Sequence, residues 1–106
     1  MACNADLVQY LVEQCGPEGQ VEARKMFGDY GLYLDDILVG LICDNNLYLK
    51  PTEAGRALMP SVQMRPPYDG AKDYFYISEV DHRDFLTLLV RTTAQALSKP
   101  LRDKRK

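Results

Sequence analysis

The segment Ile37–Cys43 constrains the fold more than any other part of the chain. It reads ILVGLIC, apolar throughout apart from Gly40, and aspartate and asparagine occupy positions 35–36 and 44–46 on either side. A short apolar run between turn residues indicates a central strand covered on both faces, since a membrane-spanning helix needs about 20 residues. Aspartate and asparagine tolerate the left-handed conformations of tight reversals. The segment therefore predicts the middle strand of an antiparallel sheet.

The sequence on both sides of this segment predicts its partner strands. Tyr30–Leu34 alternates, with the leucines and Tyr30 on one face and Gly31 and Tyr33 on the other, and Leu47–Lys50 alternates again. We therefore expect a three-stranded antiparallel meander, with strand character beginning at Val21. The two glycines at 28 and 31 fit neither dinucleotide-binding nor P-loop spacing, and they lead into a strand, so we interpret them as a bend or bulge.

Helices are expected before, between and after the strands along the chain, gathered on one face of the sheet. Apolar residues at helical spacing predict a first helix over 4–15, a short second helix over 53–59 capped by Thr52, and a last helix that Asp81 caps. Between the last two, 64–68 contains two prolines and can form only a short edge segment, whereas 73–78 is a better strand. This order predicts a two-layer α+β domain, α-β(3)-α-β(2)-α, with an antiparallel sheet.

Length and charge indicate one soluble domain with a short tail. The chain has 106 residues, 46% of them hydrophobic and 26% charged, which is typical of one globular domain. Residues 99–106 carry five basic groups and one acid, a net charge of +4 that leaves −6 for residues 1–98. We interpret 1–98 as the domain and 99–106 as a solvated basic tail, with a phosphate-contacting arm as the alternative. We expect no signal peptide, no membrane span and a cytoplasmic location.

The residues that usually carry catalysis or bind metals are scarce. Cys3, Cys15 and Cys43 are widely spaced, and His82 is the only histidine, so neither a disulfide framework nor a zinc site is indicated. No serine has a nucleophile-elbow context. The acids at 35, 36 and 44 are interpreted as turn residues. We therefore expect reduced thiols and no catalytic residue, cofactor or metal.

Tyrosines on the strands, with basic residues near them, form the one candidate surface. Three roles fit them: cross-strand packing, a protein-protein contact, and stacking of nucleic-acid bases, which the acidic body disfavours. The candidate interface or ligand residues are Arg24, Lys25, Tyr30, Tyr33, Tyr48, Lys50, Tyr74 and Tyr76.

The order and identity of residues 24–50 resemble the N-terminal domain of TfoX/Sxy-type competence regulators. The matching pattern is R-K-M-F-G-x-Y-G-L-Y-x-D, then an apolar strand, then D-x-x-L-Y-L-K, and weaker similarity extends the match to about 6–97. The resemblance implies a two-layer fold like that of type III secretion chaperones and a regulatory background. Asp29 and Asp36 replace glycines usual in the family, so we expect more strained turns there. Full competence regulators carry a second, C-terminal domain, which we do not expect here.

The residues and the resemblance together predict a non-enzymatic interaction domain that acts through a protein partner, in transcriptional control. Self-association as a homodimer, through an exposed sheet face or edge, is a further option, and nucleic acid is not expected as a direct ligand. The alternative is a small-molecule binder or enzyme with a cleft formed by Tyr30, Tyr33, Tyr48, Arg24 and Lys50.

Overall fold

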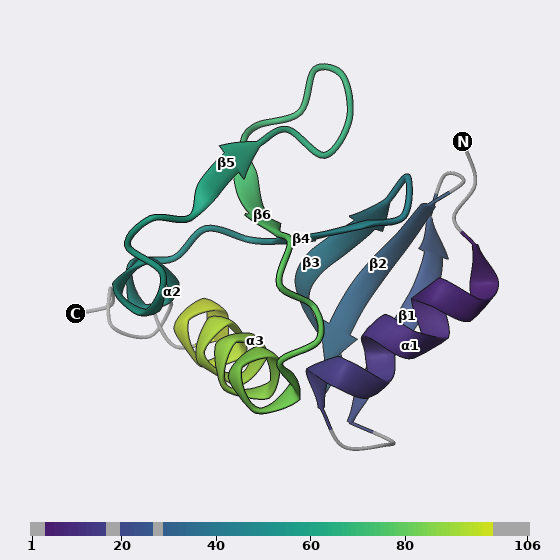
Figure 1. Cartoon of the computed structure of the whole chain (residues 1–106), viewed down its shortest axis with the longest axis horizontal. Helices are drawn as coiled ribbons and strands as arrows, with labels where there is room; N and C mark the ends of the chain where they lie inside the picture. The colour runs from purple at the N-terminus through teal and green to yellow at the C-terminus, as the bar shows by residue number, and fades with distance from the viewer. Residues whose placement is uncertain (1–3, 17–19, 27–28, 99–106) are drawn as a thin grey trace.

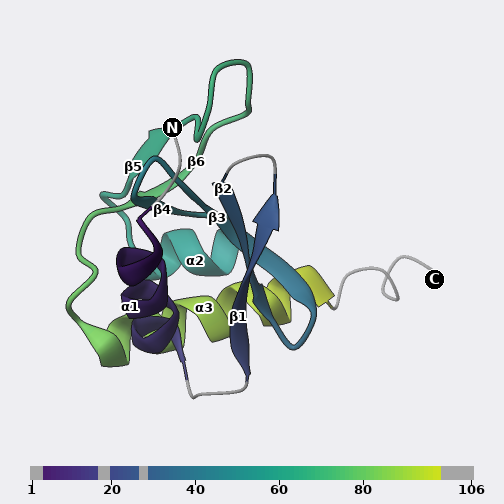
Figure 2. The same ribbon diagram turned by 90° about the vertical axis from the view of Figure 1, so that its right-hand side faces the viewer.

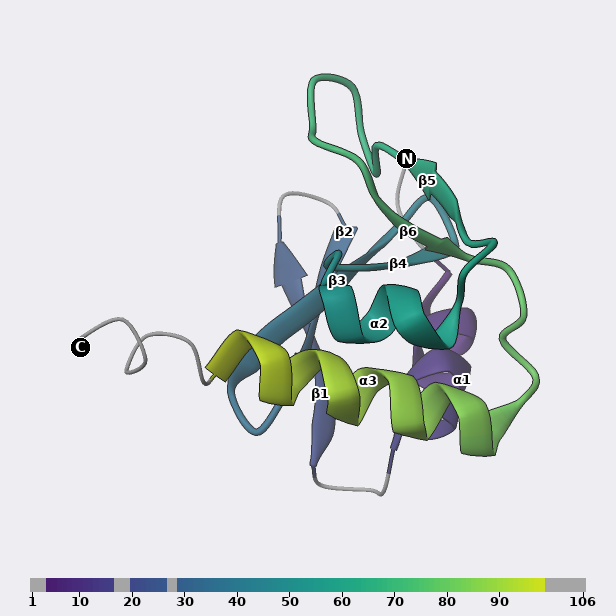
Figure 3. The ribbon, with the colours of Figure 1, turned by 90° about the vertical axis from the view of Figure 1, so that its left-hand side faces the viewer.

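The computed structural model describes residues 4–16, 20–26 and 29–98, which form two layers. One layer is an antiparallel sheet with strand order β1-β2-β3-β4-β6-β5. The other consists of three helices, which lie together on one face of this sheet (Figures 1 and 3). The elements of the described residues are α1 Ala5–Cys15, β1 Val21–Met26, β2 Asp29–Leu34, β3 Ile37–Cys43, β4 Asn46–Leu49, α2 Glu53–Leu58, β5 Gln63–Arg65, β6 Tyr74–Ile77 and α3 Arg83–Ser98.

The predicted two-layer α+β class is confirmed, but the expected number of strands before α2 is wrong. Val21–Met26 is a strand of its own, paired with β2 from Val21 opposite Leu34 to Met26 opposite Asp29. Strand character was predicted from Val21 onward, but three of these six residues are charged, so apolar alternation did not distinguish the segment as a strand separate from β2. An edge strand tolerates this composition because only one of its two sides is paired in the sheet.

The helix caps explain where the helices begin. The Asn4 side chain accepts hydrogen bonds from the N–H groups of Asp6 (2.8 Å) and Leu7 (3.3 Å), and Thr52 accepts one from Gly55 N–H at 2.9 Å, so both predicted N-termini are confirmed. The prediction that Asp81 caps α3 is wrong. Because α3 begins at Arg83, the cap position falls on His82, and the Asp81 carboxylate instead accepts a hydrogen bond from the Tyr10 hydroxyl of α1.

Two tight turns join the central strands, as the sequence predicted. The backbone φ is +49° at Asp35 and +70° at Asp36 between β2 and β3, and +51° at Asp44 and +65° at Asn45 between β3 and β4. Two consecutive residues with positive φ give the hairpin turn whose twist matches that of the strands. At Asp36, where the resemblance noted above would place glycine, an L-residue occupies the left-handed region, as expected from that departure.

A bulge in β3 divides its apolar residues between the two faces of the sheet. Leu32 pairs with Gly40 but Tyr33 pairs with Leu38, so Val39 is an extra residue at this point. Val39 and Ile42 consequently belong to the helix-side core, while Leu38, Leu41 and Cys43 belong to a cluster on the opposite face. The expected central position of this strand is confirmed. Side chains of the neighbouring strands, rather than a second layer, cover its other face.

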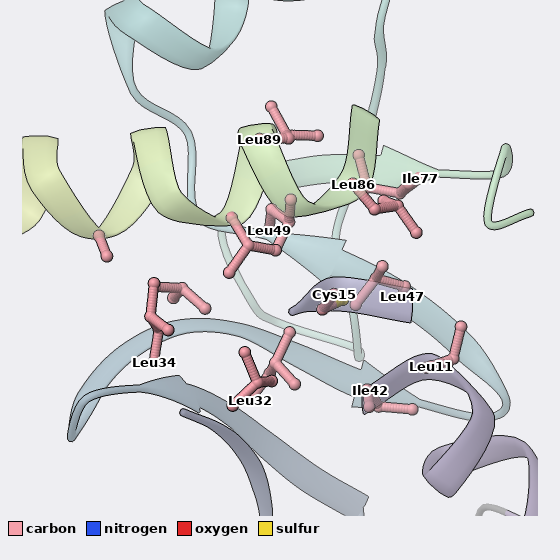
Figure 4. Close-up of a cluster of buried hydrophobic side chains, with 14 of the residues drawn as sticks. Leu11, Cys15, Leu32, Leu34, Ile42, Leu47, Leu49, Ile77, Leu86 and Leu89 are labelled. Atoms are coloured by element: carbon pink, nitrogen blue, oxygen red, sulfur yellow. The ribbon is translucent and has the colours of Figure 1, made fainter. Parts of the chain in front are cut away.

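The main core lies between the helices and the sheet, where side chains from both layers point toward one another (Figure 4). Phe75, Leu49, Leu86 and Leu89 are all 0% exposed. Burying a side chain of this size stabilises the folded state by about 1.5–3 kcal/mol. No helix among the described residues has the length and apolar character needed to cross a bilayer.

Candidate functional site

We call the sheet face opposite the helices the helix-free face. It carries a second cluster of hydrophobic side chains. Its centre is buried, and half-buried side chains surround it. The buried members are Leu41, Cys43 and Tyr48, and the half-buried ones are Met26, Leu38, Tyr74 and Tyr76. These side chains alternate along the strands with the core residues of the opposite face, as the two-residue period of a strand requires.

The structure brings together part of the predicted candidate set on this face. Tyr48, Tyr74 and Tyr76 belong to the cluster, and Arg24 and Tyr33 extend it toward β1 and β2. Tyr30 is separated from them because it packs against the helix-side core. Lys25 is exposed on β1 at a position whose alternation places it on the helix side, and Lys50 is half-buried just after β4.

Arg24 is held in place by three neighbours. Its guanidinium lies 4.2 Å from the centroid of the Tyr33 ring, its Nε donates to Glu22 Oε2 at 2.5 Å, and its Nη2 donates to Asp36 Oδ1 at 2.6 Å. These hydrogen bonds, to Glu22 first and then to Asp36, raise the pKa of Arg24 above its usual value. Arg24 therefore forms a fixed cation over an aromatic ring, between two carboxylates.

A second arginine, Arg65 of β5, makes the same kind of contact at the other end of the face. Its guanidinium lies 4.2 Å from the centroid of the Tyr76 ring. The Tyr76 and Tyr48 rings lie 5.6 Å apart at an interplanar angle of 52°. The sequence reading missed Arg65, although the alternation in Gln63–Arg65 beside the tyrosines of β6 is a signal that could have found it.

The hydroxyls of Tyr48 and Tyr74 stay protonated at neutral pH. Burial raises the pKa values of both Tyr48 and Tyr74. The Tyr76 hydroxyl donates to Asn46 Oδ1 at 3.4 Å. Tyrosine hydroxyls on rigid rings can donate and accept hydrogen bonds at a contact surface.

The side chains that the sequence offered for catalysis or metal binding do not lie together at one site in the described part of the chain. No group of three potential metal ligands occurs among the described residues. The His82 side chain is 68% exposed, and its Nε2 lies 3.1 Å from Glu79 Oε1. Asp35, Asp36 and Asp44 are turn residues, as predicted. Gly31 lies within β2, whereas Gly28 and the basic segment 99–106 are outside the described residues.

Cys15 and Cys43 are buried free thiols. Burial raises the pKa of Cys15 to about 12 from an ordinary value of 9.0. A thiol with this pKa is almost entirely protonated at neutral pH and is therefore a poor nucleophile.

The raised pKa of Cys15 predicts a loss of stability in alkali. Above pH 9 the unfolded chain releases this proton while the folded chain keeps it until about pH 12, so the stabilisation present below pH 9 is lost as the pH rises. We expect urea unfolding at pH 8, 9 and 10 to show that the advantage of wild type over Cys15→Ala shrinks by about 1.4 kcal/mol in total between pH 8 and pH 10, most of it above pH 9. Parallel pH profiles for the two proteins would contradict this expectation.

A crevice of about 810 Å³ lies between α1 and β1, on the helix side of the sheet. Its lining comprises Ala5, Val8, Gln9, Val12, Glu13, Gly16, Val21, Glu22, Ala23, Tyr30 and Arg83. Of the five residues expected to form a cleft for a small molecule, only Tyr30 is here. Tyr33 and Tyr48 lie on the opposite face of the sheet, so the structure does not assemble that cleft.

These features define a small α+β domain whose sheet has one face packed against helices and one face rich in tyrosine and arginine. The TfoX N-terminal domain family matches residues 13–97, which include the whole R-K-M-F-G pattern and both central hairpins. The chain therefore belongs to the TfoX N-terminal domain family. It is also 42% identical over 101 residues to the "Uncharacterized 12.7 kDa protein in trpE 5′ region" of Spirochaeta aurantia, a match that covers 94% of this chain and 88% of that protein.

Proposed function

We propose that this protein is a non-catalytic interaction domain that binds a protein partner through the helix-free face and acts in transcriptional control. The observation that carries the proposal is the pair of arginine-tyrosine stacks, Arg24 on Tyr33 and Arg65 on Tyr76, at the two ends of one sheet face. Tyrosine, arginine and methionine are enriched in protein interfaces, and tyrosine and arginine recur among the residues that dominate binding energy. The regulatory role rests on the resemblance to competence regulators.

The charges around this face favour a protein over nucleic acid as the partner. Arg24 is already paired with Glu22 and Asp36, so two carboxylates stand beside the cation. Phosphate binding requires cations that are free to replace the counterions of the nucleic acid. A face in which acids surround one of the two stacked arginines is poorly suited to a polyanion, and it suits a partner with its own polar and basic groups.

Site-specific photo-crosslinking in cells tests this proposal. A photoreactive phenylalanine analogue placed at Tyr33 or at Tyr76 should capture the same protein, because both rings lie on the helix-free face. The matched control is Leu88, a 45% exposed residue of α3 in the helix layer. Crosslinks to one protein from positions 33 and 76, with none from 88, are the expected result. Capture from position 88 alone, or no capture from 33 and 76, would contradict the proposal.

A further inference from the structure

The outer edge of β1 has no strand partner among the described residues. Among the described strands, β1 and β5 form the two edges of the sheet. β5 has three residues and is followed by two prolines, which shorten and blunt an edge. β1 has six residues and no proline, and Figure 2 shows no other described element in front of it. The β1 edge therefore offers backbone N–H and C=O groups to a further strand.

The hydrogen bonding of β1 to β2 fixes which backbone groups point outward. Asp35 N–H donates to Gln20 C=O at 3.1 Å, one step beyond the pair of Val21 with Leu34. Hydrogen-bonded and non-bonded pairs alternate along an antiparallel ladder, so positions 22, 24 and 26 bond to β2. The N–H and C=O groups of Val21, Ala23 and Lys25 consequently face away from the sheet.

We propose that a second copy of this chain pairs its β1 antiparallel with this edge, with Ala23 opposite Ala23 on the two-fold axis. In this register Val21 pairs with Lys25 of the second copy, so all three outward-facing residues of each strand find partners of the same kind. A shift by one residue would bring outward-facing groups against groups already bonded to β2. A shift by two would leave part of the edge unpaired.

Charge complementarity favours a second copy over an unrelated strand. The proposed register places Glu22 directly opposite Arg24 of the second copy, and Arg24 opposite Glu22, on the helix-free face. Opposite charges facing one another across antiparallel strands stabilise the pair, whereas like charges destabilise it. On the helix side, Lys25 of the second copy comes beside Val21, at a crevice that Glu13 also lines. An inward-pointing lysine discourages generic strand addition, and Glu13 offsets that effect for this partner.

The dimer does not depend on the proposed function. Its two-fold axis runs perpendicular to the sheet, so the two helix-free faces join into one continuous surface on the same side. Arg24 belongs to both surfaces, but the strand pairing itself is made by backbone groups of β1. The oligomeric state of the protein alone can therefore be measured without the partner, and each proposal can be tested without the other.

Charge complementation measured by light scattering tests the register. Wild type should show twice the 12.0 kDa mass of one chain. Glu22→Arg and Arg24→Glu each put like charges opposite one another twice and should weaken the dimer about 10-fold or more. Mixing the two variants should restore a dimer, because the two arginines on β1 of one variant then face the two glutamates on β1 of the other. Wild type that stays at 12.0 kDa up to about 100 µM, or a mixture without heterodimer, would overturn the proposal.

Proline substitution provides an independent test with its own folding control. The Ala23 N–H points away from β2, so Ala23→Pro should keep the fold by circular dichroism and abolish the dimer. The Arg24 N–H bonds to β2, so Arg24→Pro should instead destabilise the monomer. A dimer that persists unchanged in folded Ala23→Pro would also overturn the proposal.

Discussion

Replacing Gly40 by alanine is expected to destabilise the domain by at least about 3 kcal/mol and to leave a large fraction unfolded at 37 °C. A Cβ atom at this position would lie 2.1 Å from the Tyr48 carbonyl oxygen and 3.0 Å from the Leu49 Cα. Both are backbone atoms of the paired strand β4, so the clash cannot be relieved by rotating a side chain. The β3 bulge and the β3/β4 pairing would have to separate.

Gly31→Ala is the matched control for this prediction. A Cβ at Gly31 would meet the Met26 Cε at 2.8 Å, the Tyr33 ring at 3.0 Å and the Leu38 Cδ1 at 3.2 Å, all of them side-chain atoms. These can move, so we expect a cost of about 1 kcal/mol. Urea unfolding of both variants measures the contrast, and equal destabilisation at the two glycines would show that the close approach at Gly40 is not the reason for its glycine.

Phe75→Ala is the second substitution with a large expected effect. Phe75 is 0% exposed and lies on the helix side of β6, where α2 packs on it through Gly55. Removing a buried ring loses its transfer free energy and leaves a cavity, so we expect a loss of about 3–5 kcal/mol in unfolding free energy.

The neighbouring residue Tyr74 supplies the control on the same strand. Its side chain lies on the helix-free face and is only half-buried, so Tyr74→Ala should cost clearly less, about 1–2 kcal/mol. Thermal unfolding of both variants compares the two faces of the sheet. A larger loss at Tyr74 than at Phe75 would contradict the assignment of the core to the helix side.

The local signals in the sequence were sufficient for most of the fold. The turn residues at 35–36 and 44–45 lie where the backbone takes positive φ, Thr52 caps α2 as expected, and α1 begins close to the predicted residue. The sequence did not predict β1 as a separate strand because its charged residues reflect an edge position. That position depends on the order of strands in the sheet. Asp81 was misassigned because its hydrogen bond to Tyr10 joins two elements far apart in the chain.

The candidate surface could be predicted only in part from the sequence. Alternation identified Tyr74 and Tyr76 as side chains of one face, but it could not show that Tyr30 faces the helices while Tyr33 faces away from them beside Arg24. Arg65 joins the surface through the pairing of β5 with β6, a contact between strands that local periodicity does not encode. The β3 bulge, which moves Leu41 to the helix-free face, likewise depends on pairing across strands.

The affinity of the captured partner for two arginine variants tests the central claim, that the helix-free face is the binding surface. Arg65→Ala removes the guanidinium that stacks on Tyr76, and Arg91→Ala removes an exposed guanidinium from α3 in the helix layer. Isothermal titration calorimetry with purified proteins should show binding weakened about 10-fold or more by Arg65→Ala and changed less than about twofold by Arg91→Ala. Loss of binding with Arg91→Ala while Arg65→Ala binds like wild type would contradict the claim.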